Sequence, residues 1–492
     1  MKQLSGLDAA FLHLETEAQF GHVSALTVFS RPPEDPTYEP YTAWREQLRR
    51  RLPLLAPLRR RLVEVPLGLD HPFWLEDPDF DLDFHVRHAA VPPPGGEAQL
   101  AAVVARMIGR ALDRARPLWL SYVIEGLADE RFAILTIFHH AAVDGVLGAE
   151  VMGLMLDRHP DGGPDPVGDD WRPEAQPGGL QMLSRGTLGL ARKPARAVLL
   201  AARTAEELGR ATRTPALARA ARQVRAGLGG PVGAVLNAGR SRPAERDEAV
   251  PLPSVRPPRA PFNERITPHR RVAIGTASLD DVKAIKNAHG ATVNDVVIAV
   301  CAAGLRAWLE RHDALPSEPL VAMIPISTRT GNEQDPWQNR VSMLTASLPT
   351  DEPDPAQRLR TVHRVMQQSK ELWGALPAER LTDAVEFSPP AVFARAMRLS
   401  ARLGLGSRTA PGNLVISNIP GPREPLFAAG AALEHYYPLS MILEGQGLNI
   451  TVQSYLDRLD FGLVCCPELV PDVDELLEAI LGEITSLAAA CP

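Results

Sequence analysis

Residues 132–145 read FAILTIFHHAAVDG, and this stretch decides the fold. The run 132–138 is apolar apart from one threonine, which predicts a fully buried strand. A short loop follows at 139–145, and apolar residues recur at helical spacing over 146–156. The histidine-rich loop therefore lies between a buried strand and a helix, a position at which proteins often place their chemistry.

The sequence on either side predicts further strands and helices. Residues 119–127 read as a strand that turns at 128–131 into the buried strand. Later strands are expected at 272–277, 320–325, 414–417, 448–455 and 459–464, and helices at 278–289, 292–309 and 355–376. The helix at 278 begins with Ser278 and has Asp281 in the capping-box position, and residues 292–295 begin the next helix. Mixed sheets flanked by helices fit this order, so the fold class is α/β.

A chain of 492 residues is too long for one ordinary core, so two domains are expected. The Pro-, Gly- and Asp-rich stretch 160–179 and the Pro-rich stretch 251–261 mark linkers. We therefore expect an N-terminal domain at 1–180, a basic helical connector at 181–260 and a C-terminal domain at 261–492.

The connector is strongly basic. Residues 185–242 contain twelve Arg or Lys against two Glu, a net charge of +10. Arg192, Arg196, Arg203 and Arg210 recur at spacings of four and seven, as on an amphipathic helix with a cationic face. Such a face suits an anionic membrane or a lipid-droplet surface. The alternative is a solvated helix that joins the two domains.

Composition excludes several classes of protein. The net charge of −7 shows no footprint of nucleic-acid binding. The four cysteines form no CxxC pair and none is near a histidine at metal-ligand spacing, which indicates reduced thiols. Residues 1–8 do not resemble a secretory signal, and the apolar runs are shorter than the roughly 20 residues of a membrane span. We expect a cytoplasmic protein whose membrane contact, if any, is peripheral.

The loop 139–145 carries the residues suited to chemistry. A neutral imidazole can accept a proton from an alcohol near pH 7 and return it to a leaving group. Adjacent histidines point in different directions, so only one of His139 and His140 is expected to face the reaction. Asp144 suits an architectural role on a sharp turn, and Gly145 permits a tight conformation. Two alternatives are metal ligation and an inert loop with satisfied histidines.

The chain resembles the bacterial wax ester synthase/acyl-CoA:diacylglycerol acyltransferase family. The family motif HHxxxDG matches residues 139–145, and its catalytic base corresponds to His140. Further matches are spread over the chain, at residues 4–12 with 21–23, 112–119, 294–297, 417–422 and 447–450. The resemblance implies two chloramphenicol-acetyltransferase-like domains with the active site at their interface, and a strand and turn at the N-terminus.

The resemblance also implies a set of substrate-binding residues. Pro117, Leu118 and Trp119 match a PLW motif, and Asn294 with Asp295 match an ND motif. Asn294 would orient the active-site loops or donate a hydrogen bond near the oxyanion. Each match has a structural alternative: Pro117 and Trp119 as core residues, Asn294 as a helix cap, and 417–422 as a turn. Phe20-Gly21 before His22 departs from the family pattern.

The expected reaction is transfer of a fatty acyl group from acyl-CoA to diacylglycerol or to a fatty alcohol. Acyl-CoA is then a co-substrate, and no cofactor or metal is expected. Apolar tunnels discriminate weakly, by about 1 to 3 kcal/mol per methylene, so triacylglycerol and wax ester synthesis stay open. Two alternatives remain: a specialised polyketide or sugar alcohol as acceptor, and an inactive lipid-droplet coat protein.

Overall fold

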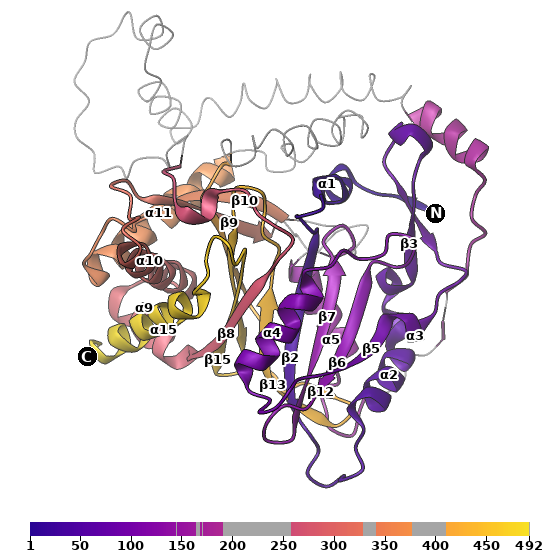
Figure 1. Cartoon of the computed structure of the whole chain (residues 1–492), viewed down its shortest axis with the longest axis horizontal. Helices are drawn as coiled ribbons and strands as arrows, with labels where there is room; N and C mark the ends of the chain where they lie inside the picture. Colours follow the sequence, from indigo (N-terminus) through magenta and orange to yellow (C-terminus); the bar gives the residue numbers. More distant parts are fainter. Residues whose placement is uncertain are drawn as a thin grey trace, which may run out of the picture.

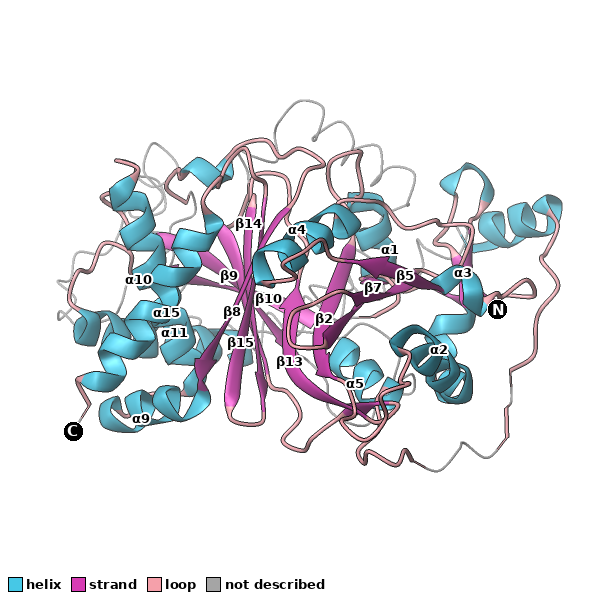
Figure 2. Ribbon diagram, turned by 60° about the horizontal axis from the view of Figure 1, so that its bottom comes forward, coloured by secondary structure: helices cyan, strands magenta, loops and turns pink. Residues whose placement is uncertain are grey.

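A computed structural model describes residues 1–143, 145–163, 168–169, 171–189, 257–327, 341–375 and 410–491. Two six-stranded mixed sheets lie next to each other, one in each half of the molecule (Figure 1). Helices pack against both sheets, and strand β13 (Ala431–Leu439) of the first sheet contacts β14 (Leu448–Tyr455) and β15 (Arg458–Cys465) of the second (Figure 2). This two-layered arrangement in each half is the predicted α/β class.

The first sheet has the order β12-β13-β2-β7-β6-β5. Its strands are β2 (His22–Ser30), β5 (Val86–Ala90), β6 (Trp119–Glu125), β7 (Arg131–His139), β12 (Phe427–Ala428) and β13 (Ala431–Leu439). Neighbours are antiparallel except β5 and β6. Every residue of β7 after its first is buried, which confirms the predicted buried strand.

The other elements of the first half surround this sheet. A small sheet joins β1 (Lys2–Gln3), β4 (Phe73–Glu76) and β3 (Arg60–Val63). The helices are α1 (Gly6–Leu14), α2 (Pro40–Arg51), α3 (Leu82–His85), α4 (Glu97–Ile108) and α5 (Gly145–Met155), with 3-10 turns at Leu52–Leu54, Ala56–Arg59 and Pro66–Gly68. The expectation of an N-terminal strand and turn is wrong for residues 6–14, which form helix α1. Ser5 caps a helix there because its hydroxyl accepts from Asp8 N at 3.1 Å.

The second sheet has the order β10-β9-β11-β14-β15-β8. Its strands are β8 (Arg271–Ser278), β9 (Leu320–Ser327), β10 (Val341–Leu348), β11 (Leu414–Ile419), β14 (Leu448–Tyr455) and β15 (Arg458–Cys465). Helices α9 (Leu279–His289), α10 (Val293–Arg311), α11 (Pro355–Ala375) and α15 (Val473–Ala489) pack on its outer side, and a 3-10 turn lies at Pro261–Asn263. Ser278 is the N-cap of α9, as predicted, and α10 begins where a helix was expected, with Thr292 as its N-cap.

The hairpin β12–β13 departs from a simple division of the chain. It belongs to the second half in sequence, yet β13 pairs with β2 of the first sheet from Ser24 to Ser30. The buried carboxylate of Asp460 in β15 accepts from Tyr436 N at 2.7 Å and from the Thr276 hydroxyl at 2.6 Å, so the hairpin is also bonded to the second sheet. This hairpin from the second half of the sequence therefore completes the first sheet and links it to the second.

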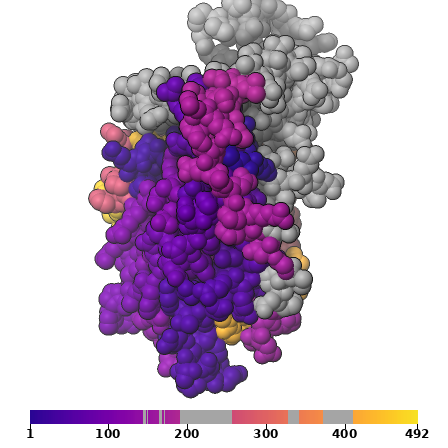
Figure 3. Space-filling model, turned by 90° about the vertical axis from the view of Figure 1, so that its right-hand side faces the viewer, coloured from indigo at the N-terminus to yellow at the C-terminus, as the bar shows by residue number. Residues whose placement is uncertain are grey.

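Residues 171–189 lie across the surface of the first half (Figure 3). The Met1 ammonium donates to Glu174 at 2.7 Å, and Met182 is buried beside Val63, Val65 and Leu75. The predicted boundary at residue 180 thus falls within a segment that packs on the N-terminal half. Most of the predicted connector, including its four spaced arginines, lies outside the described residues, so the connector stays a prediction.

Among the described helices, none by itself has the length and apolar composition of a membrane span. Helices α9 and α10 meet that measure only when taken together, across a bend of 100°.

Candidate active site

The histidine pair lies where β7 leaves the first sheet. His139 is the last residue of β7 and pairs with His22 of β2, while its N–H donates to Leu118 O at 2.9 Å. His140 N donates to Gly21 O at 2.7 Å. Ala142 N and Val143 N then turn back to His139 O, at 2.9 and 3.2 Å. These bonds hold the backbone of both histidines on two sides.

The His139 side chain faces the protein interior and is 1 % exposed. Its Nδ1 accepts from Ala141 N at 3.0 Å, so the neutral ring carries its proton on Nε2. Nε2 lies 3.1 Å from Oε1 of Glu15. A buried ring with Nδ1 hydrogen-bonded and Nε2 beside a carboxylate suits a structural role.

Glu15 is the centre of a buried polar network that sequence reasoning missed. Besides His139, it accepts from Gly21 N at 2.8 Å and from the Arg114 guanidinium at 2.6 Å. Burial raises the pKa of Glu15, but the bonds from His139, Gly21 and Arg114 outweigh burial and hold this pKa at about 2. Glu15 is 124 positions from His139, so no local pattern in the sequence signals the contact.

The His140 ring is partly exposed and has a different neighbour. It stacks on the Phe11 ring of α1, with the ring centroids 3.9 Å apart and the planes within 11° of parallel. One face of the imidazole is therefore covered by an aromatic ring, and a half-buried imidazole is suited to exchange protons with a bound alcohol. The two histidines differ in their surroundings, as predicted.

The rest of the HHxxxDG loop is only partly described. Asp144 lies outside the described residues, so its predicted architectural role stays a prediction. Gly145 begins α5, which places the loop directly before a helix as expected.

The PLW residues occupy the core beside the histidines. Pro117, Leu118 and Trp119 are buried, and the Trp119 indole donates to Leu58 O at 2.7 Å while its ring stacks on His85. Leu118 O is the acceptor for His139 N. The geometry favours the core interpretation: these residues support the end of β7, and a substrate-binding role for them stays a prediction.

The ND residues lie in the first turn of α10. Asp295 completes a capping box by accepting from Thr292 N at 2.9 Å, and it also lies 2.8 Å from His363 Nδ1. The cap is therefore Thr292 and not Asn294. Asn294 Oδ1 is 3.5 Å from Asn418 Nδ2, which brings two of the family-like segments together. Asn418 is in β11, so the turn expected at 417–422 begins only after Ile419.

The comparisons with known proteins agree with this geometry. The pattern of the wax ester synthase/diacylglycerol acyltransferase catalytic domain matches residues 4–297, and that of the C-terminal domain matches residues 337–488. The chain belongs to this family.

Relatives of the family cover almost the whole chain. The O-acyltransferase WSD of Acinetobacter baylyi is 33% identical over 487 residues, which are 98% of this chain and 96% of the relative. The wax ester synthase/diacylglycerol acyltransferase structure from Marinobacter aquaeolei VT8 superposes with a TM-score of 0.69 at 30% identity, covering 100% of both chains. A condensation domain of the calcium-dependent antibiotic synthetase has a TM-score of 0.56 at 15% identity, covering 100% of this chain and 97% of that one, which shows the shared fold. The predicted two-domain acyltransferase fold is confirmed.

In this wax ester synthase/diacylglycerol acyltransferase chain, the segment before β2 joins the histidine site to the second half. Arg270 Nη2 donates to Ala18 O at 2.5 Å, and Glu444 N donates to Gln19 Oε1 at 2.7 Å. Two residues after Gln19, the Gly21 carbonyl oxygen accepts from His140 N. The histidine pair therefore lies beside the junction of the two halves.

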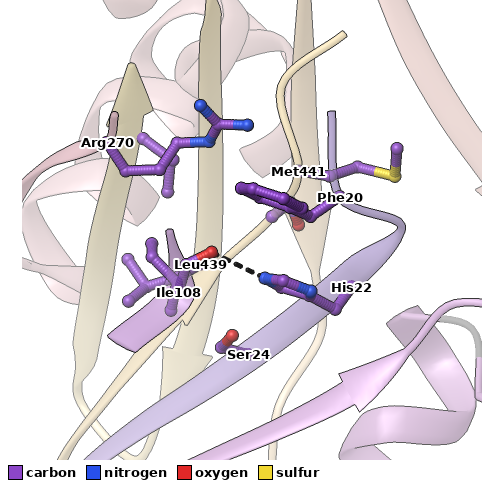
Figure 4. A pocket seen from close by; sticks show the side chains of 9 residues that line it. Phe20, His22, Ser24, Ile108, Arg270, Leu439 and Met441 are labelled. Carbon is purple, nitrogen blue, oxygen red and sulfur yellow. Dashed lines mark hydrogen bonds between the residues drawn. The ribbon is translucent and has the colours of Figure 1, made fainter. Parts of the chain in front are cut away.

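A small pocket marks this junction (Figure 4). Phe20, His22 and Ile108 approach it from the first half and Arg270 and Met441 from the second. Burial lowers the pKa of His22 to about 4, against the effect of its 2.7 Å bond to Ile108 O, so this imidazole is neutral near pH 7. The cavity volume is about 10 Å³, at most one water molecule, so the pocket is a packing junction and not an acyl site.

Metal ligation was one alternative for the histidine loop. Within the described residues, no group of three or more His, Cys, Asp or Glu side chains is arranged to hold a metal ion.

Proposed function

We propose that this chain transfers a fatty acyl group from acyl-CoA to the hydroxyl of diacylglycerol or of a long-chain alcohol, with His140 as the general base. The family membership and the names of its relatives support the reaction. The arrangement of the two histidines supports the choice of base. His139 is buried against Glu15, whereas His140 is partly exposed at the end of β7.

The proposed step is a direct attack. The neutral His140 imidazole takes the hydroxyl proton as the alcohol oxygen forms a bond to the thioester carbonyl carbon. The carbon–sulfur bond then breaks, and the imidazolium returns the proton to the departing thiolate, so the products are an ester and free CoA. No covalent acyl-enzyme is required. Donors at the oxyanion would contribute about 3 to 4 kcal/mol, and Asn294 is proposed as one of them.

Acyl-CoA acts in this proposal as a co-substrate, and the chemistry needs no further cofactor. The reaction is proposed to take place at the inner membrane or on a lipid droplet, because both acceptors partition into lipid. The net charge of +10 over residues 185–242 supports contact with anionic lipid. Peripheral attachment of a cytoplasmic enzyme would fit both points.

The test is release of CoA thiol from palmitoyl-CoA, with either a diacylglycerol or hexadecanol as acceptor. Wild type, His140→Ala and the control His88→Ala are compared, since His88 lies in β5, an edge strand of the same sheet. Release that needs an acceptor and His140, but not His88, is the expected result. The better acceptor then separates triacylglycerol from wax ester synthesis. Wild-type rates in His140→Ala would refute the base, and no release with either acceptor would favour a specialised alcohol or an inactive coat protein.

A further inference from the structure

Helix α1 contacts both histidines. Phe11 stacks on the ring of His140, and Glu15, the C-cap residue of the same helix, lies 3.1 Å from Nε2 of His139. These two residues are four positions apart, so they lie on the same side of the helix. One short helix therefore touches both members of the pair.

Helix α1 is held at both ends, so Phe11 has a defined position. At the start, Ser5 and Asp8 form a reciprocal capping box with bonds of 3.1 and 3.4 Å. At the end, Arg114 donates to Leu12 O at 2.6 Å and Gln19 donates to Leu14 O at 2.8 Å. A ring on a helix that is fixed in this way can restrain whatever it packs against.

We propose that Phe11 is a positioning residue for acyl transfer, which fixes the plane of the His140 imidazole and favours its protonated form during proton transfer. The inference rests on the proposed role of His140 as general base. Phe11 itself touches no reacting atom.

The parallel stack supports the claim that Phe11 fixes the plane of the His140 imidazole. With the planes within 11° and the centroids 3.9 Å apart, a large rotation of the imidazole about its χ2 bond would bring its edge into the phenyl ring. The nitrogens carry their lone pair and proton in the ring plane, so the stacked phenyl ring does not cover the directions in which they bond, although Nδ1 is itself buried. Phe11 thus restricts the orientation of the base without occupying the position of the alcohol.

The charge that develops during the reaction supports the claim that Phe11 favours the protonated form of His140. The imidazole becomes an imidazolium as it takes the proton, and an aromatic face attracts a cation more strongly than a neutral ring. The stack is therefore stronger in the transition state than in the resting enzyme. Interactions of that kind raise kcat and leave substrate binding nearly unchanged.

The experiment compares Phe11→Leu with Phe11→Tyr. Leucine keeps an apolar side chain but removes the aromatic face, whereas tyrosine keeps it. The matched control is Phe80→Leu, because Phe80 also stacks on a histidine, His85, with centroids 5.5 Å apart. We measure kcat and KM for CoA release from palmitoyl-CoA, the pH dependence of kcat, and the melting temperature. His140→Ala is included in each series.

In Phe11→Leu we expect kcat to fall roughly ten- to a hundredfold with little change in KM. Without the aromatic face the imidazolium loses this attraction, so the acid limb of the measured kcat profile should move to lower pH by roughly half a unit. Phe11→Tyr and Phe80→Leu should behave like wild type in both respects.

Wild-type kcat in Phe11→Leu would overturn the inference. So would a loss of activity with an unmoved pH profile, or a loss that Phe11→Tyr shares, since either would show a merely structural role. His140→Ala separates the two claims. If that variant is inactive while Phe11→Leu is normal, the base stands and the positioning role fails. If it is active, the proposed base fails, and the premise of this inference fails with it.

Discussion

Glu15 Oε1 lies 3.1 Å from His139 Nε2, so the first histidine of the HHxxxDG motif lies against the end of a helix near the N-terminus. The same carboxylate accepts from Gly21 N and from Arg114. The backbone that carries His140 is therefore held through its neighbour, and the histidine loop, α1 and the segment before β2 form one connected unit.

Replacement of Glu15 by Gln should destabilise this unit. The amide keeps the shape but loses the charge, which leaves Arg114 and His139 with weaker bonds in a buried site. We expect a loss of about 1 to 3 kcal/mol in the free energy of unfolding, measured by urea denaturation. Glu17→Gln is a matched control, because Glu17 is exposed. Equal urea midpoints for Glu15→Gln and Glu17→Gln would contradict a stabilising role for the Glu15 carboxylate.

The pKa of Glu15 predicts acid sensitivity. Its folded pKa of about 2 lies below the ordinary value of 4.5, so the carboxylate stabilises the fold fully above about pH 4.5. That stability is lost as the pH falls from 4.5 toward 2 and Glu15 becomes protonated in the folded state. The free energy of unfolding should therefore fall less steeply over this range in Glu15→Gln than in wild type. If the free energy of unfolding falls equally with pH in wild type and Glu15→Gln, Glu15 does not titrate as described.

Alanine variants of the two histidines should lose different properties: His140→Ala activity, and His139→Ala stability. His140→Ala removes the proposed base and should lower the rate by roughly a hundred- to ten-thousandfold, with a melting temperature near that of wild type. His139→Ala should lower the melting temperature, because it leaves the buried Glu15 with one partner fewer. Calorimetry and CoA release on the same samples separate the two effects. A destabilised His140→Ala of full specific activity would reverse the assignment.

Gly21 has no room for a side chain. An added Cβ would lie 2.8 Å from His139 Nε2 and 3.1 Å from Phe11 O. Gly21→Ala should therefore displace the histidine or helix α1 and reduce both stability and kcat. Gly153→Ala is the control, since a Cβ on this helical glycine of α5 meets nothing within 4 Å, and it should be neutral or stabilising. Full activity in Gly21→Ala, measured by CoA release, would show that the contact relaxes freely.

Asp460 should hold the β12–β13 hairpin at the junction. Its buried carboxylate accepts from Tyr436 N and Thr276 Oγ1, so Asp460→Ala leaves one buried and one partly buried donor without this acceptor. We expect faster amide hydrogen exchange across residues 431–439 and a stability loss of roughly 2 to 5 kcal/mol. The exposed Asp457 gives the control variant Asp457→Ala. Unchanged exchange in Asp460→Ala would show that pairing with β2 alone holds the hairpin.

The sequence by itself determined the features that depend on neighbouring residues. The apolar run 132–138 predicted β7 because a buried strand needs continuous apolar residues. Ser278 predicted the start of α9 because a cap needs only the next three residues. The motif at 139–145 and the family-like segments along the chain indicated the family and His140 as the base.

Only the tertiary structure decided which side chains surround the histidines. Phe11 and Glu15 reach His140 and His139 across more than 120 residues, and β13 joins β2 across about 400. No local pattern encodes such contacts, because their free energy comes from burial and pairing that exist only once the chain is folded. The same reason explains why Trp119 was a candidate for substrate binding from its motif but is a buried core residue in the structure.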